Sequence, residues 1–151
     1  MSTTTTSLAV VLNSLLQTCK DGEEGFRSAA DNATDSHLRA LFDELSIQRR
    51  DFAVDLQPLV TSLGGGARES GSISGIIHRG WMDLKAAFAS NDNHAILAEC
   101  ERAEDTAAAE YQQALEHDDL PPEVRATVRQ QYMAIQSAHD RVRDMRDSFA
   151  T

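Results

Sequence analysis

The stretch SHLRALFDELSIQRRDFAVDLQPLVTSLGGG, residues 36–66, decides the fold class of this chain. Its apolar residues recur at steps of three, four or seven, which is the spacing of a helix that buries one face. Consecutive glycines at residues 64–66 then end the helix, because glycine adopts the backbone conformations that close a helix C-terminus. The apolar face of this predicted helix consists of Leu38, Leu41, Leu45, Phe52, Leu56, Leu59 and Leu63.

The segments on either side repeat the same pattern. Residues 34–36 supply a short turn and an N-cap, so the preceding amphipathic helix is expected to lie antiparallel to this one. Later in the chain, residues 91–93 offer caps for another helix, and Pro121 and Pro122 begin one more, because proline is tolerated in a first turn. The four long helices are predicted at about residues 6–32, 36–63, 93–115 and 122–149.

The connection between the second and third long helices, residues 64–91, has a helical stripe of its own. The stripe predicts a crossover helix that lies against the bundle, and it is formed by Ile73, Ile76, Ile77, Trp81, Leu84 and Phe88. We therefore expect an all-α chain with a single domain over residues 6–149, after a disordered N-terminus at residues 1–5. The expected architecture is a ferritin-like antiparallel four-helix bundle with an additional crossover helix between helices two and three.

Composition and charge exclude several classes of partner. The chain has 24 acidic and 14 basic residues, a formal charge of −10, and no stripe of lysine and arginine that could neutralise phosphates. Nucleic acid and anionic membranes are therefore not expected as partners. Residues 2–19 are uncharged but lack a basic segment, so they indicate neither a signal peptide nor a membrane span. Cys19 and Cys100 form no paired motif, which favours reduced, buried thiols in a cytoplasmic protein.

Five polar residues interrupt the apolar stripes near the middle of the long helices: Glu23, Gln48, Glu101, Glu104 and His139. Burying such a group without a partner costs roughly 1 to 3 kcal/mol, so their occurrence on four helices at similar depth indicates a shared site in the core. Glu101 and Glu104 are three residues apart and share one helical face. Whether Glu23 or its neighbour Glu24 faces the core depends on where the first helix begins.

This arrangement resembles in part the ligand pattern of the ferritin-like superfamily. Such proteins place a Glu on the first and third helices and Glu-x-x-His on the second and fourth. The resemblance implies metal-ligand roles for Glu23, for Glu101 or Glu104, and for His139. The chain departs from the pattern, because Leu45 and Gln48 stand where the second helix should carry Glu and His, and Gln136 precedes His139 where a glutamate is expected. Since these ligands are missing, di-iron oxidoreductase activity is not expected.

Three short stretches carry a closer resemblance. Residues 18–26 (TCKDGEEGF), 78–81 (HRGW) and 99–105 (ECERAED) resemble an uncharacterised bacterial family of small ferritin-like four-helix bundles. The likeness runs from about residue 8 to about residue 147. That family has an assigned fold and no established activity, so the resemblance implies the architecture and adds little about a reaction.

Two interpretations of the five polar residues stay open. The carboxylates and the imidazole suit one Fe(II), Mn(II) or Zn(II) ion, with Gln48 as a weak ligand or as a donor to a ligand. Alternatively, the same residues hold one another in a hydrogen-bonded core network without any metal. The first interpretation predicts a metal-binding ferritin-like protein of unestablished activity. The second predicts a metal-free, non-enzymatic bundle that acts through homo-oligomerisation or protein contacts, and neither identifies a small-molecule substrate.

Overall fold

The computed structural model describes residues 2–63, Ala89 and residues 92–149. Within these ranges, the burial of side chains is described from Leu8 onward. The long helices of these residues are α1 (Ser2–Asn32), α2 (Ser36–Ser62), α4 (Asn93–Leu115) and α5 (Pro122–Ser148). No strand occurs among the described residues, and the prediction of an all-α four-helix bundle is confirmed. The predicted crossover helix falls on residues 64–91, which lie outside the described residues except for Ala89. Among the described helices, none combines the length and the apolar character that crossing a membrane requires.

Local signals in the sequence place the helix ends. The Asp35 carboxylate accepts hydrogen bonds from two backbone N–H groups in the first turn of α2, at 2.8 and 3.1 Å. Asp92 caps α4 in the same way, with one such hydrogen bond of 3.2 Å. α5 begins at Pro122, as predicted. α1 begins at Ser2, ahead of the predicted start near residue 6.

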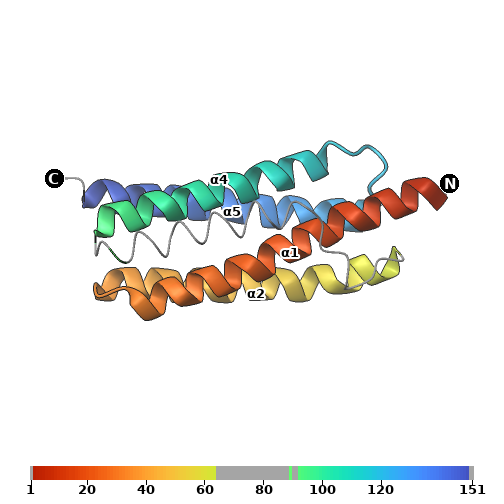
Figure 1. Ribbon diagram of the computed structural model, residues 1–151. Coiled ribbons are helices and arrows are strands. Elements are labelled where there is room, and N and C mark those ends of the chain that lie inside the picture. The colour runs from red at the N-terminus through yellow and green to blue at the C-terminus, as the bar shows by residue number, and fades with distance from the viewer. Residues whose placement is uncertain (1, 64–88, 90–91, 150–151) are drawn as a thin grey trace.

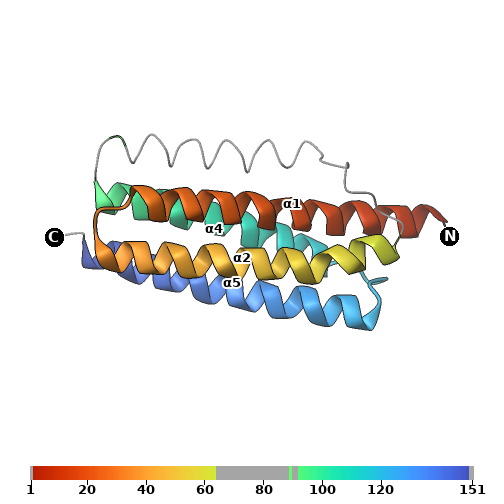
Figure 2. The same ribbon diagram turned by 90° about the horizontal axis from the view of Figure 1, so that it is seen from below.

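The helices pair as two antiparallel hairpins (Figure 1). Residues 33–35 join α1 to α2, and residues 116–121 join α4 to α5. The hairpins pack side by side so that α1 lies against α4 and α2 lies against α5, as the view from below also shows (Figure 2). The start of α1 and the end of α5 therefore lie at opposite ends of an elongated bundle.

The buried apolar side chains form two hydrophobic clusters along the bundle. The cluster nearer the α1–α2 turn contains Phe26 and Phe42, whose stacked rings have centroids 6.3 Å apart. The second cluster, toward the other end, is built around leucines such as Leu12 and Leu56, both 0% exposed. Full burial of one such side chain contributes about 1.5 to 3 kcal/mol, so these clusters hold the two hairpins together. Between the clusters, the helices carry a layer of polar residues.

Candidate functional site

A buried ion pair occupies the middle of the bundle, between the two hydrophobic clusters. The Arg49 side chain on α2 is 2% exposed and the Glu104 side chain on α4 is 0% exposed, and Arg49 Nη2 lies 2.5 Å from Glu104 Oε2. The Arg49 guanidinium also lies over the Phe26 ring, 5.3 Å from its centroid, in a cation–π contact. On α1, Gly22 leaves room for the arginine, because a Cβ atom there would be 3.3 Å from Arg49 Cγ.

The surroundings of Arg49 keep it charged although it is buried. Burial by itself lowers the pKa of Arg49, but the charge of Glu104 and the hydrogen bond to it outweigh that effect and raise the pKa above its usual value. The second carboxylate oxygen, Glu104 Oε1, has no hydrogen-bond partner in the described part of the chain. Glu104, one of the three carboxylates that were predicted as metal ligands, is therefore paired with an internal cation.

A second polar network lies close to the ion pair and links all four described long helices. The Tyr111 hydroxyl on α4 donates to Gln131 Oε1 on α5 at 2.7 Å, and it lies 3.0 Å from Cys19 Sγ on α1. Gln131 Nε2 in turn donates to the Phe52 carbonyl oxygen on α2 at 3.3 Å. Burial raises the pKa of the Cys19 thiol to about 11 and raises the pKa of Tyr111 well above its usual value. Both groups are therefore neutral hydrogen-bonding groups at physiological pH.

Two of the predicted site residues lie at the edge of the core. The Glu23 side chain is 20% exposed and forms an ion pair of 2.5 Å with Arg27, one turn further along α1, and Glu24 is exposed. Gln48 is half-buried, and its Oε1 accepts a hydrogen bond from Arg49 Nε at 3.2 Å. Neither Glu23 nor Gln48 has a described direct contact with the other three predicted residues, although Arg49 links Gln48 to Glu104.

The structure brings Glu101 and His139 together at the seam between α4 and α5. His139 Nε2 lies 3.2 Å from Glu101 Oε2 and 2.9 Å from Oδ1 of Asp105, one turn further along α4. The other ring nitrogen, Nδ1, lies 3.2 Å from Asp140 Oδ1. Arg146 forms an ion pair with the remaining oxygen of Glu101. We call Glu101, Asp105 and His139 the seam cluster.

The seam cluster is shielded on one side and open on the other. The side chains of Glu101 and His139 are 15% and 21% exposed, whereas that of Asp105 is 66% exposed. As the side chains lie, no three His, Cys, Asp or Glu residues in the described ranges are arranged to hold a metal ion. An ion could be bound in the seam cluster only if it took the place of the direct contacts between the imidazole and the two carboxylates.

Helical periodicity alone misses the residue that pairs with Glu104. Arg49 continues the buried spacing of Leu38, Phe42 and Leu45, so its place on the inner face is visible in the sequence. An arginine is nevertheless expected on the solvated face unless a buried acid is known to oppose it, and that acid lies on another helix. The sequence did contain a signal for Asp105. It follows Glu101 by four residues, so the two side chains share one face of the helix.

Taken together, the fold and these contacts define a class: an all-α four-helix bundle protein with a polar layer and a buried ion pair in its core. Residues 8–117 match the family model of the domain of unknown function DUF2383. Since the match covers more than half of the 151 residues, the protein belongs to this family. The matched residues run from α1 past the end of α4, and α5 with His139 follows them. No curated protein matches the chain.

Proposed function

We propose that this protein binds one divalent transition-metal ion, Zn(II), Mn(II) or Fe(II), at the seam between α4 and α5, with Glu101, Asp105 and His139 as ligands. The observation that supports the proposal is the approach of His139 Nε2 to two carboxylate oxygens at once, at 2.9 and 3.2 Å. Two carboxylates and one imidazole form a ligand set that suits these ions. This site keeps two of the residues that the sequence predicted and adds Asp105.

The second ring nitrogen of His139 supports the same reading. When Nδ1 donates its proton to Asp140, Nε2 carries a lone pair that faces Glu101 and Asp105. Three electron-rich atoms then face one another, and a cation between them removes the repulsion. Histidines that bind metals commonly donate their other N–H to a carboxylate, which is the role that Asp140 would take.

The spacing of the donor atoms fits one small ion. Ligand atoms that each lie about 2.0 to 2.2 Å from one metal ion are roughly 3 Å apart when they meet at a right angle. The contacts of His139 Nε2 with the two carboxylates have this spacing, and the exposed Asp105 side chain is free of helix packing that would prevent it from turning. Glu101 would keep its ion pair with Arg146 through its other oxygen. Water would complete the coordination on the open side.

We also propose that the chain is a divergent relative of the ferritin-like proteins. Two antiparallel hairpins joined by a long connection, residues 64–91, support this relationship. A two-metal centre does not fit the core, because Arg49 neutralises Glu104 and because Gln48 stands in place of the expected histidine. We therefore assign no redox reaction to the core.

Titration calorimetry of the chelator-treated full chain with Zn(II) and Mn(II) tests the metal proposal. We expect about one equivalent to bind and the binding to be lost in His139→Ala, because the only imidazole ligand is gone. Asp140→Asn should weaken binding by about 10- to 100-fold, since it acts through the orientation of the imidazole.

Two matched controls locate the site. Glu23→Gln and His37→Ala remove a carboxylate and an exposed imidazole outside the seam cluster, and both variants should bind like the wild type. Wild-type affinity in His139→Ala, or no binding heat with any of the ions, would remove the proposal. Loss of binding in Glu23→Gln would move the site to the core.

A second candidate function is that of a metal-free bundle that acts through homo-oligomerisation. The Arg49–Glu104 pair supports only the metal-free part, because the arginine neutralises the core carboxylate. The surface candidates for homo-oligomerisation are Ile47 and Val54, which are 49% and 64% exposed and lie two helical turns apart on α2. Light scattering should then give a multiple of the 16.5 kDa chain mass, equal with and without chelator. Ile47→Glu with Val54→Glu should reduce that mass, while Ala126→Glu, on an exposed position of α5, should not. A monomer in all samples would exclude this function.

A further inference from the structure

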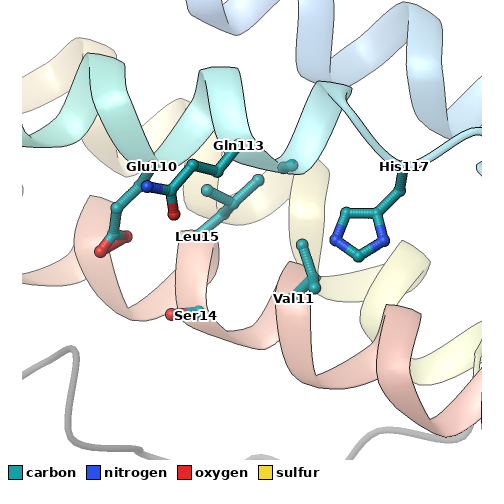
Figure 3. Close-up of a pocket in the computed structure, with 7 residues that line it drawn as sticks. Val11, Ser14, Leu15, Glu110, Gln113 and His117 are labelled. Carbon is teal, nitrogen blue, oxygen red and sulfur yellow. The ribbon is translucent and has the colours of Figure 1, made fainter.

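A pocket opens between α1 and α4, away from the seam cluster (Figure 3). Its volume is about 100 Å³. Apolar and polar side chains both line the pocket, with Glu110 toward one end and His117 toward the other in the view of Figure 3, and Ser14 and Gln113 between them. The residues that line it are Val11, Ser14, Leu15, Glu110, Gln113, Ala114 and His117.

Glu110 is a partly buried carboxylate without a cationic partner among the described residues. Its Oε1 accepts a hydrogen bond of 2.5 Å from the Thr18 hydroxyl, and its Oε2 is buried without a hydrogen-bond partner in the same part of the chain. Burial raises the pKa of Glu110, the hydrogen bond from Thr18 lowers it, and the charge of Asp21 raises it, with a net upward shift. The surroundings thus disfavour the negative charge; the Thr18 hydrogen bond offsets this only in part, and no cation among the described residues pairs with the carboxylate.

The other shielded glutamates of the described residues differ from Glu110 in this respect. Each has an arginine in contact: Glu23 with Arg27, Glu99 with Arg102, Glu101 with Arg146, and Glu104 with Arg49. No lysine, arginine or histidine among the described residues forms an ion pair with Glu110, although the carboxylate lines a pocket that a small molecule can enter. A cation from outside the chain would neutralise the Glu110 carboxylate, as an arginine neutralises each of the other four glutamates.

We infer that this pocket binds an alkylammonium group, with the ammonium ion against Glu110 and a short alkyl chain along Val11, Leu15 and Ala114. The size supports a chain of a few carbons, because an apolar cavity of roughly 150 Å³ holds a benzene molecule. Glu110 is the only carboxylate in the described lining, so a single ammonium group fits better than a diamine. The source is either a free small amine or the lysine side chain of a peptide, since both present the same group.

The test is a titration of the isotope-labelled full chain followed by amide NMR shifts, with n-butylammonium as the probe and n-butanol as its neutral counterpart. A ligand of this size is expected to bind with a dissociation constant of about 1 mM. Butylammonium should shift the amide signals of Val11, Leu15 and Ala114. The dissociation constant of butanol should be at least about tenfold higher than that of butylammonium, because butanol lacks the charge-assisted hydrogen bond. Nα-acetyl-lysine N-methylamide distinguishes the sources, since tighter binding than butylammonium assigns the site to a lysine side chain and weaker binding assigns it to a free amine.

Matched variants keep the test decisive. Glu110→Gln retains the shape and the oxygen that accepts from Thr18, so the fold is expected to persist, and butylammonium should bind about tenfold more weakly. Glu116→Gln removes an exposed carboxylate near the end of the same helix and should leave binding unchanged. Equal binding of butylammonium and butanol, undiminished binding in Glu110→Gln, or no shifts up to about 100 mM probe would overturn the inference.

Discussion

Replacing Arg49 by methionine is expected to lower the free energy of unfolding by about 3 to 5 kcal/mol. The substitution keeps a long, unbranched side chain in the core but removes the positive charge next to the 0% exposed Glu104 carboxylate. That carboxylate already has one oxygen without a partner among the described residues, so the lost guanidinium would leave it buried and unpaired. Urea unfolding of the wild type and the variant, followed by far-ultraviolet circular dichroism, measures the difference.

The double variant separates the charge effect from the packing effect. Arg49→Met combined with Glu104→Met removes both charges and fills the layer with apolar side chains of similar length. We expect its stability to lie within about 1 kcal/mol of the wild type or above it, because replacing a buried ion pair by apolar residues is often neutral or stabilising. If the single variant fails to fold, the double variant still reports on the pair. Equal stability of the single variant and the wild type would show that the pair is not buried as described.

The second large effect is a loss of stability at alkaline pH. In the folded protein, burial raises the pKa of Cys19 from 9.0 to about 11. Above pH 9 the unfolded chain therefore releases this proton while the folded protein keeps it, so the stabilisation is complete below pH 9 and is lost as pH rises toward 11. The loss amounts to about 1.4 kcal/mol per pH unit, or roughly 2 to 3 kcal/mol in all. Cys100 and Tyr111 act with the same sign, because burial also raises their pKa values.

Denaturant unfolding at several pH values between about 8 and about 11 measures this effect, and Cys19→Ala is the control. The variant is expected to be less stable at about pH 8, since it leaves a small cavity beside Tyr111. Its stability should fall less steeply above about pH 9 than that of the wild type, because one of the titrating groups is gone. Parallel curves for the two proteins would contradict a protonated, buried thiol at position 19.

The helices could be predicted because their signals are local. Asp35, Asp92 and Pro122 mark helix starts through their own side chains, and the apolar spacing of each helix is contained in its own segment. The core contacts could be predicted only in part. Adjacent positions on a helix point about 100° apart, so assigning Gln48 instead of Arg49 to the inner face misplaced the polar layer by one residue.

The same limit applies to the other site residues. On α1 the position opposite Arg49 is Gly22, whose lack of a side chain is meaningful only once the arginine is known to lie there. Glu101 and His139 were correctly expected to lie near one another, and they meet at a distance of 3.2 Å. Their depth, at a partly exposed seam and not on the axis of the bundle, depends on how far each helix is rotated. The rotation of a helix about its axis is set by the packing of all four helices, so it cannot be predicted from the apolar stripe of one helix alone.

The most direct test of the metal proposal is anomalous diffraction from crystals of the full chain soaked with Zn(II). We predict a zinc peak bounded by His139 Nε2 and the carboxylates of Glu101 and Asp105, about 2.0 to 2.2 Å from each donor atom, with Arg49 still paired to Glu104. A zinc peak beside Glu104 with Arg49 displaced, or no peak at the seam between α4 and α5, would contradict the account.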